Sequence, residues 1–192
     1  MSRPVAVLIF SITTVAVGSV GFGWQAQRQE SSAFSKDPQL GRPAPDWNNE
    51  SWLNTKGPLR LHDLKGRVVL LNFWVYTCYN CTNTVPSLVD FDRKYRDHGL
   101  TIVGIHTPEF PPYSGEHDRG NVARALKQYG IEYPNAQDND SRTWNLYGIR
   151  YWPSFVLIDK KGIIRYEGAG EFHLHDATYG RWEQRIRELV AE

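Results

Sequence analysis

Residues 68–81 have the sequence VVLLNFWVYTCYNC. The first eight form a continuous run of apolar, β-branched and aromatic residues, interrupted only by Asn72, as in a strand that is buried on both faces. Cys78 and Cys81 follow three positions apart, and they are the only cysteines of the chain. A helical pattern begins after them, so the pair lies between a buried strand and a helix. This placement predicts both the fold class and the chemistry.

A thiol at the amino terminus of a helix faces unpaired backbone N–H groups and the positive end of the helix dipole. Both stabilise the thiolate, so the pKa of such a thiol falls from about 8.5 toward 7 or below. A second cysteine one turn later can resolve a mixed disulfide. We therefore expect Cys78 to be the nucleophile, Cys81 to be the resolving cysteine, and the two to form a redox-active disulfide. Half of a four-ligand zinc set is missing, so we expect no metal and no cofactor.

Composition narrows the remaining classes. The chain has 192 residues, of which 41% are hydrophobic and 22% are charged, which is typical of a globular protein and excludes a collagen-like, coiled-coil or disordered chain. It carries 22 basic and 21 acidic residues, for a formal net charge of +1. Because no block of like charge stands out, a nucleic-acid partner is not expected.

The amino-terminal segment predicts a membrane association. Residues 4–27 contain no charged side chain, and a spanning helix needs about 20 mostly apolar residues. We expect residues 1–24 to be an uncleaved membrane anchor, with a cleaved signal as the alternative, because small-residue cleavage sites are weak there. Residues 25–40 are polar and predict a flexible linker, and 41–192 predict one domain. Either alternative places that domain outside the cytoplasm, on the periplasmic or cell-surface side.

Hydrophobic periodicity and turn residues predict the other elements. The predicted strands are 59–61, 68–75, 100–106, 155–159 and 163–167. The predicted helices are one that starts at the cysteine pair and ends near Gly99, and those at 121–129, 141–147 and 179–191. This order predicts an α/β fold with a mixed central sheet and helices on both faces. Apart from the short opening strand, it is the order of a thioredoxin fold with a helical insertion between core strands.

Residues 72–81 resemble the active-site strand and turn of thioredoxin-like proteins. The resemblance is strongest to the extracytoplasmic, membrane-tethered thioredoxins of the TlpA class and to the soluble thioredoxin-like domain of DipZ-type proteins. Pro86 matches the proline that kinks the active-site helix in thioredoxins. The other matching segments are 104–110, 138–140 and 147–153. Together they extend from about Gly41 to Gly170.

The resemblance implies a thiol-disulfide oxidoreductase that acts as a reductant. Its partners would be cysteine-containing proteins, with apocytochrome c or a disulfide carrier among the open choices, and a transmembrane electron donor. The resemblance also makes Pro153 the cis-proline that faces the cysteines, although a trans-proline that begins a strand is the alternative. Trp152 would then flank the substrate groove, or else be a core aromatic.

Two positions depart from the family pattern. Thioredoxins carry a buried Asp where this chain has Asn72, and several TlpA-like proteins carry a Glu where it has Thr84. Neither residue can take a proton from the resolving cysteine. Glu109 follows a core strand and is a candidate proton relay, with a solvated loop carboxylate as the alternative, and Asn72 would orient a water. His106 is expected to be a packed or hydrogen-bonded residue at a strand end.

Two other functions compete with the leading one. A thiol peroxidase shares the fold, but such enzymes need a Pro and a Thr ahead of the reactive cysteine, and no Pro precedes Cys78 within its loop. A copper chaperone of the SCO type spaces its cysteines by three intervening residues and adds a distal His. The spacing here is two, although His173 and His175 offer candidate ligands.

Overall fold

The structure is a computed structural model that describes residues 39–192. The expected anchor, residues 1–24, and most of the expected linker, 25–40, lie outside the described residues. No helix within 39–192 is long and apolar enough to cross a membrane.

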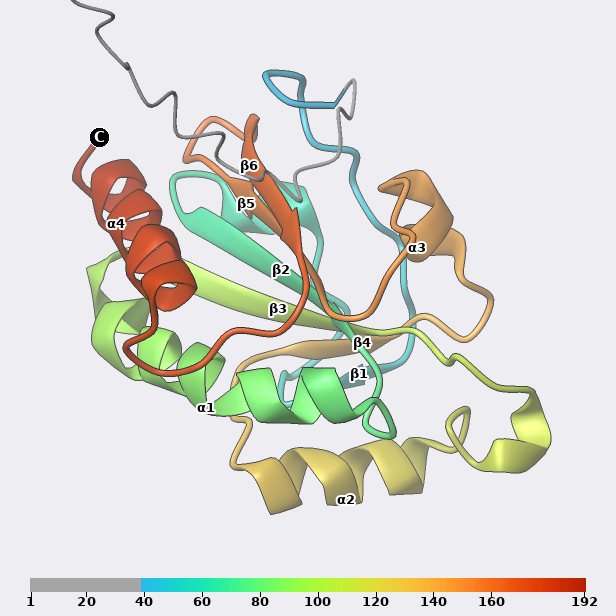
Figure 1. Cartoon of the computed structure of the whole chain (residues 1–192). Coiled ribbons are helices and arrows are strands. Elements are labelled where there is room, and N and C mark those ends of the chain that lie inside the picture. Colours follow the sequence, from blue (N-terminus) through green and yellow to red (C-terminus); the bar gives the residue numbers. More distant parts are fainter. Residues whose placement is uncertain (1–38) are drawn as a thin grey trace, which may run out of the picture. The chain divides into compact units, whose positions relative to one another are not determined.

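The described chain forms one mixed sheet flanked by helices (Figure 1). Its strand order is β1-β4-β3-β2-β5-β6, with β2 parallel to β3 and antiparallel to β5. The strands are β1 (Trp52–Leu53), β2 (Val68–Trp74), β3 (Leu100–His106), β4 (Asn135–Gln137), β5 (Ser154–Ile158) and β6 (Ile164–Ala169). The α-helices are α1 (Tyr79–Tyr95), α2 (Arg119–Tyr129), α3 (Arg142–Leu146) and α4 (Ala177–Ala191). The predicted mixed sheet with a helical insertion, here α2 between β3 and β5, is confirmed.

Every residue of strand β2 is buried, because β2 lies inside the sheet between β3 and β5 and helices cover both of its faces. Its side chains alternate between the two faces. Val68, Leu70 and Trp74 pack in a core with residues of α1, α2 and α4. Leu71 and Phe73 belong to a second core, closed by α3 and the segment before β2. Helices therefore cover both faces, as expected.

The topology brings three loops to one edge of the sheet. Strands β2 and β3 are parallel and in register to their ends, where Trp74 pairs with His106. Strand β5 is antiparallel to β2 and begins beside its end, with Ser154 opposite Phe73. The loop that carries the cysteines, the loop after β3 and the loop before β5 consequently meet at this edge.

Three local predictions were wrong or incomplete. Residues 59–61 do not form a strand; a short 3-10 helix covers Leu61–Leu64 instead. Asp63 accepts the Arg60 N–H and Asp46 accepts the Leu61 N–H, so these backbone groups are satisfied without a strand partner. The short strands β1 and β4 were not predicted.

Candidate active site

Cys78 and Cys81 form a disulfide at the amino-terminal end of α1, with their Cα atoms 5.3 Å apart. Cys78 is the N-cap residue, and its Sγ accepts the backbone N–H of Cys81 at 3.2 Å. Helix N–H groups at this position have no partner within the helix, and the dipole there favours negative charge. The Cys78 sulfur thus occupies the position at which a thiolate is stabilised.

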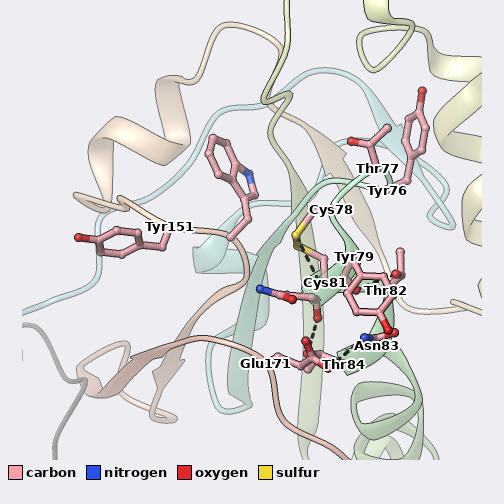
Figure 2. The surroundings of a disulfide bond; sticks show 12 residues. Tyr76, Thr77, Cys78, Tyr79, Cys81, Thr82, Asn83, Thr84, Tyr151 and Glu171 are labelled. Carbon is pink, nitrogen blue, oxygen red and sulfur yellow. Dashed lines mark hydrogen bonds between the residues drawn. A yellow bond between two sulfur atoms is a disulfide. The ribbon is translucent and has the colours of Figure 1, made fainter.

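The two cysteines differ in accessibility. Cys78 is partly exposed, whereas Cys81 is only 2% exposed and belongs to the core beneath α1. Figure 2 shows the pair with Tyr79 and Tyr151 on either side of it in this view. Both tyrosines are exposed, at 75% and 67%. A partner that approaches from solvent therefore meets the Cys78 sulfur and exposed aromatic rings before it meets Cys81.

The loop before β5 carries the other expected site residues. The Trp152–Pro153 peptide bond is cis, as expected. The Trp152 indole stacks on Trp144 with ring centroids 4.0 Å apart, and its Nε1–H donates to the carbonyl of Thr107 at 3.1 Å. Trp152 therefore joins this loop to the loop after β3. Its ring is partly exposed, so it is neither a free surface residue nor a fully buried one.

Asn72 and Thr84 occupy buried positions where neither can act as a base. Asn72 is 1% exposed, and its Oδ1 has no hydrogen-bond partner within residues 39–192. The hydroxyl of Tyr133 is its buried neighbour and also lacks a partner in that range; burial raises the pKa of this tyrosine. Thr84 donates its hydroxyl to the carbonyl of Asn80 at 2.8 Å (Figure 2). Neither of these two side chains can therefore accept the proton of Cys81 itself.

The loop after β3 contains a buried carboxylate that the sequence analysis missed. Glu109, the expected relay, is exposed, and its backbone N–H donates to Glu116 at 2.8 Å. Glu116 itself is fully buried and accepts the hydroxyl of Thr77, the residue before Cys78. Glu116 lies in a Pro-rich loop with no apolar periodicity, so no local signal in the sequence distinguishes it from a solvated residue.

His106 is buried at the end of β3, as expected for a packed histidine. Its ring stacks on Tyr76, with centroids 5.5 Å apart, and its Nε2 accepts the Tyr76 backbone N–H at 3.4 Å. The proton of the neutral ring is then on Nδ1, which has no partner among the described residues. Burial lowers the pKa of His106 to about 3. The ring is therefore neutral and supports the loop ahead of the cysteines.

This lowered pKa predicts a loss of stability in acid. In the unfolded chain a histidine titrates near pH 6.5, so between about pH 6.5 and 3 the unfolded state binds a proton that the folded state does not. Above about pH 6.5 the His106 ring is neutral in both states, and the stability of the domain is at its full value with respect to this group. As the pH falls below about 6.5, protonation of the unfolded chain lowers the free energy of unfolding. Between pH 7.5 and 5 we expect His106 to reduce the free energy of unfolding by about 2 kcal/mol. Urea unfolding of the His106→Gln protein at the two pH values should show a correspondingly smaller difference.

His98→Gln is the matched control, because His98 is exposed and its replacement should leave the difference between the two pH values unchanged. If His106→Gln loses as much stability in acid as the unmodified protein does, His106 is not the responsible group.

The candidate copper ligands are not assembled with the cysteines. The ring Nε2 of His173 pairs with Glu171 at 2.8 Å, and the backbone N–H of His173 donates to the Asp176 carboxylate. Within residues 39–192, no three His, Cys, Asp or Glu side chains gather as a metal site requires. The copper alternative is therefore not favoured.

Comparison with known proteins agrees with this geometry. The sequence model of the AhpC/TSA family matches residues 40–167. Protein DipZ of Mycobacterium tuberculosis is 42% identical over 150 residues, which are 77% of this chain and 20% of the relative. Thiol-disulfide oxidoreductase ResA of Bacillus anthracis is 29% identical over 85% of this chain and 88% of its own length. The chain thus spans about a fifth of the DipZ proteins that it matches.

Solved structures show the same fold. A Chlorobium tepidum protein provisionally identified as the thiol:disulfide interchange protein DsbE is 26% identical, with a TM-score of 0.68 over 79% of this chain and 97% of that one. A thioredoxin-like protein solved in its oxidised form is also 26% identical, with a TM-score of 0.66. The chain therefore belongs to the AhpC/TSA family, has a thioredoxin fold, and is a thioredoxin-like protein of the TlpA class.

Proposed function

We propose that this domain is a thiol-disulfide oxidoreductase that reduces disulfides of extracytoplasmic proteins through Cys78 and Cys81. One observation carries the proposal: a partly exposed sulfur at a helix amino terminus is bonded to a second sulfur that is buried one turn later. Such a pair separates the two roles that thiol-disulfide exchange requires, a reachable thiolate and a protected resolving thiol. The similarity to the ResA and DsbE proteins supports the same chemistry.

The exchange has two balanced steps. The Cys78 thiolate of the reduced protein attacks one sulfur of a partner disulfide, and the other partner sulfur leaves as a thiolate. Cys81 then loses its proton and attacks Cys78 Sγ, which releases the second partner sulfur as a thiolate and closes the Cys78–Cys81 disulfide. Two electrons pass to the partner, which becomes a dithiol when its thiolates take up protons. A transmembrane electron donor is the proposed source of the electrons that restore the dithiol.

The loop before β5 is the proposed binding wall for the partner. Pro153 and Trp152 lie at the same edge of the sheet as the cysteines, and the exposed ring of Tyr151 extends that wall. The exposed ring of Tyr79, on α1, lies on the other side of the cysteine pair. An extended, cysteine-containing segment of a protein suits such a wall, because its backbone can align with a strand end while its side chains contact the rings.

The proton of Cys81 requires a path to solvent. Glu109, on the exposed loop after β3, and Asn72, beneath α1, remain the proposed members of that path, Asn72 through an ordered water. Localisation is also part of the proposal: the uncharged run within residues 1–24 would hold the domain at the membrane, on its extracytoplasmic side.

Redox titration of the full chain tests the proposal. In glutathione buffers we expect one two-electron transition between the dithiol and the disulfide, at a potential near the thioredoxin end of the range, about −270 mV. The reduced protein should also reduce the disulfides of insulin. Rapid consumption of hydrogen peroxide without insulin reduction would instead support the peroxidase alternative, and a midpoint near −120 mV would reverse the proposed direction.

A further inference from the structure

Glu116 is a fully buried carboxylate close to the active-site disulfide. One oxygen, Oε1, accepts the hydroxyl of Thr77, and the other, Oε2, accepts the backbone N–H groups of Glu109 and Phe110, each at 2.8 Å. All three partners donate to the carboxylate, and this arrangement suits its anionic form. A buried charge is retained at a cost in free energy unless it is well satisfied, as this one is.

The donors to Glu116 belong to two separate loops. Thr77 lies in the loop that carries Cys78, whereas Glu109 and Phe110 lie in the loop after β3. The latter loop also contacts both sides of the site through Thr107, whose N–H donates to the Trp74 carbonyl and whose carbonyl accepts the Trp152 indole. Glu116 therefore joins the cysteine loop to the loop after β3, and Thr107 joins the loop after β3 to the end of β2 and to the loop before β5. We call these hydrogen bonds the frame of the site.

The same carboxylate places a negative charge near the reacting sulfur. Thr77 is adjacent to Cys78, so covalent geometry limits the distance from the carboxylate to Cys78 Sγ to roughly 12 Å. At that distance and an effective dielectric constant of about 20, two unit charges alter an equilibrium about tenfold. The ring of His106, which stacks on Tyr76 just ahead of Thr77, is neutral. The helix terminus favours the Cys78 thiolate, and Glu116 opposes it.

We propose that Glu116 is a positioning residue for Cys78, which holds the loop ahead of the nucleophile and biases the pair toward the disulfide by disfavouring the thiolate. The inference rests on the proposed thiol-disulfide exchange and deepens it. A protein whose thiolate is less stabilised holds its electrons less tightly, because a stabilised reduced form makes a strong oxidant. Glu116 thus supplies the reducing bias that the Tyr79-Asn80 dipeptide does not reveal.

The test is Glu116→Gln in the full chain. The Gln side chain can keep the frame, because its oxygen can accept the two backbone N–H groups while its amide donates to the Thr77 oxygen. Only the charge is removed. We expect the alkylation rate of Cys78 in the reduced protein at pH 6 to rise about tenfold, as the pH profile moves to lower pH. The equilibrium with glutathione at pH 8 should shift about tenfold toward the dithiol, which corresponds to about 30 mV.

Glu132→Gln is the matched control for net charge, because Glu132 is an exposed carboxylate that pairs with Arg96. It should change neither measurement by more than about twofold, since exposed charges are screened. An unchanged alkylation profile in Glu116→Gln would overturn the proposal.

Two further measurements keep the test decisive. If Glu116→Gln does not fold, Thr77→Val is the second variant, because it removes the hydroxyl donor to Glu116 and leaves the carboxylate charge in place. Alkylation of Cys78 at pH 6 should then slow about twofold. A faster or unchanged rate would contradict the proposal. If the unmodified protein shows no transition in glutathione buffers, the proposed function fails. Alkylation of the chemically reduced protein still reports on Glu116 in that case.

Discussion

Replacing Cys81 with serine is expected to trap the protein on its partners as mixed disulfides, whereas replacing Cys78 should abolish both trapping and insulin reduction. Cys78 is the partly exposed sulfur at the helix terminus, and the Cys81 backbone N–H donates to it. It is therefore the sulfur that attacks. Cys81 is 2% exposed and reaches only a sulfur already joined to Cys78. Without it the second step stops, and the covalent intermediate accumulates.

The measurement is non-reducing electrophoresis of each variant after incubation with a disulfide-containing protein such as insulin. Cys81→Ser should give a higher-mass band that disappears with dithiothreitol, and Cys78→Ser should give none. The double variant is the control for non-specific association. Trapping by Cys78→Ser but not by Cys81→Ser would reverse the assignment of nucleophile and resolving cysteine.

The predictable part of the fold is the part in which burial follows hydrophobicity. Strand β2 is predicted to within one residue, because all of its positions are buried and most are apolar. Strand β4 is equally buried, but its sequence is Asn135-Ala136-Gln137, which gives no apolar signal. Tertiary partners permit this burial. The Asn135 amide binds Trp74 and the Tyr133 carbonyl, and Gln137 accepts the Ser51 hydroxyl.

In the candidate site, too, one part could be predicted from the sequence and another could not. The cysteines follow from a short motif between a strand and a helix, and the motif is contiguous in sequence. Glu116 and Thr77 are 39 positions apart, and their contact depends on the path of the loop after β3. No pattern within a single sequence reveals such a contact. Glu109 lies on the same loop as Glu116 and stays the proposed proton relay, while the loop also buries a second carboxylate that the sequence does not distinguish.

One set of side-chain contacts connects strand β4 to the end of β2, from which the cysteine loop departs. Gly104 of β3 lies between Asn72 of β2 and Asn135 of β4 in the sheet. Asn135 crosses directly over this glycine, and its Oδ1 accepts the indole N–H of Trp74 at 3.0 Å. Trp74 and Asn135 are both fully buried. The absence of a side chain at Gly104 is therefore what allows Asn135 to hold the end of β2, from which the cysteine loop departs.

Gly104→Ala is accordingly expected to destabilise the domain by about 3–5 kcal/mol. A methyl group there would overlap Asn135 Oδ1 and lie 2.6 Å from its Cγ, so the amide must leave. Overpacking costs about 1–3 kcal/mol, and the Trp74 N–H that loses its acceptor adds about 1–3 kcal/mol. The Tyr133 carbonyl keeps a second donor, the Asn54 amide at 3.3 Å. The same change at Gly180, an exposed position within α4 with open space around it, should instead stabilise by about 0.5–1 kcal/mol. Urea unfolding of both oxidised variants gives the comparison. A Gly104→Ala protein within about 1 kcal/mol of the unmodified one would mean that Asn135 can move aside, and that Trp74 does not depend on it.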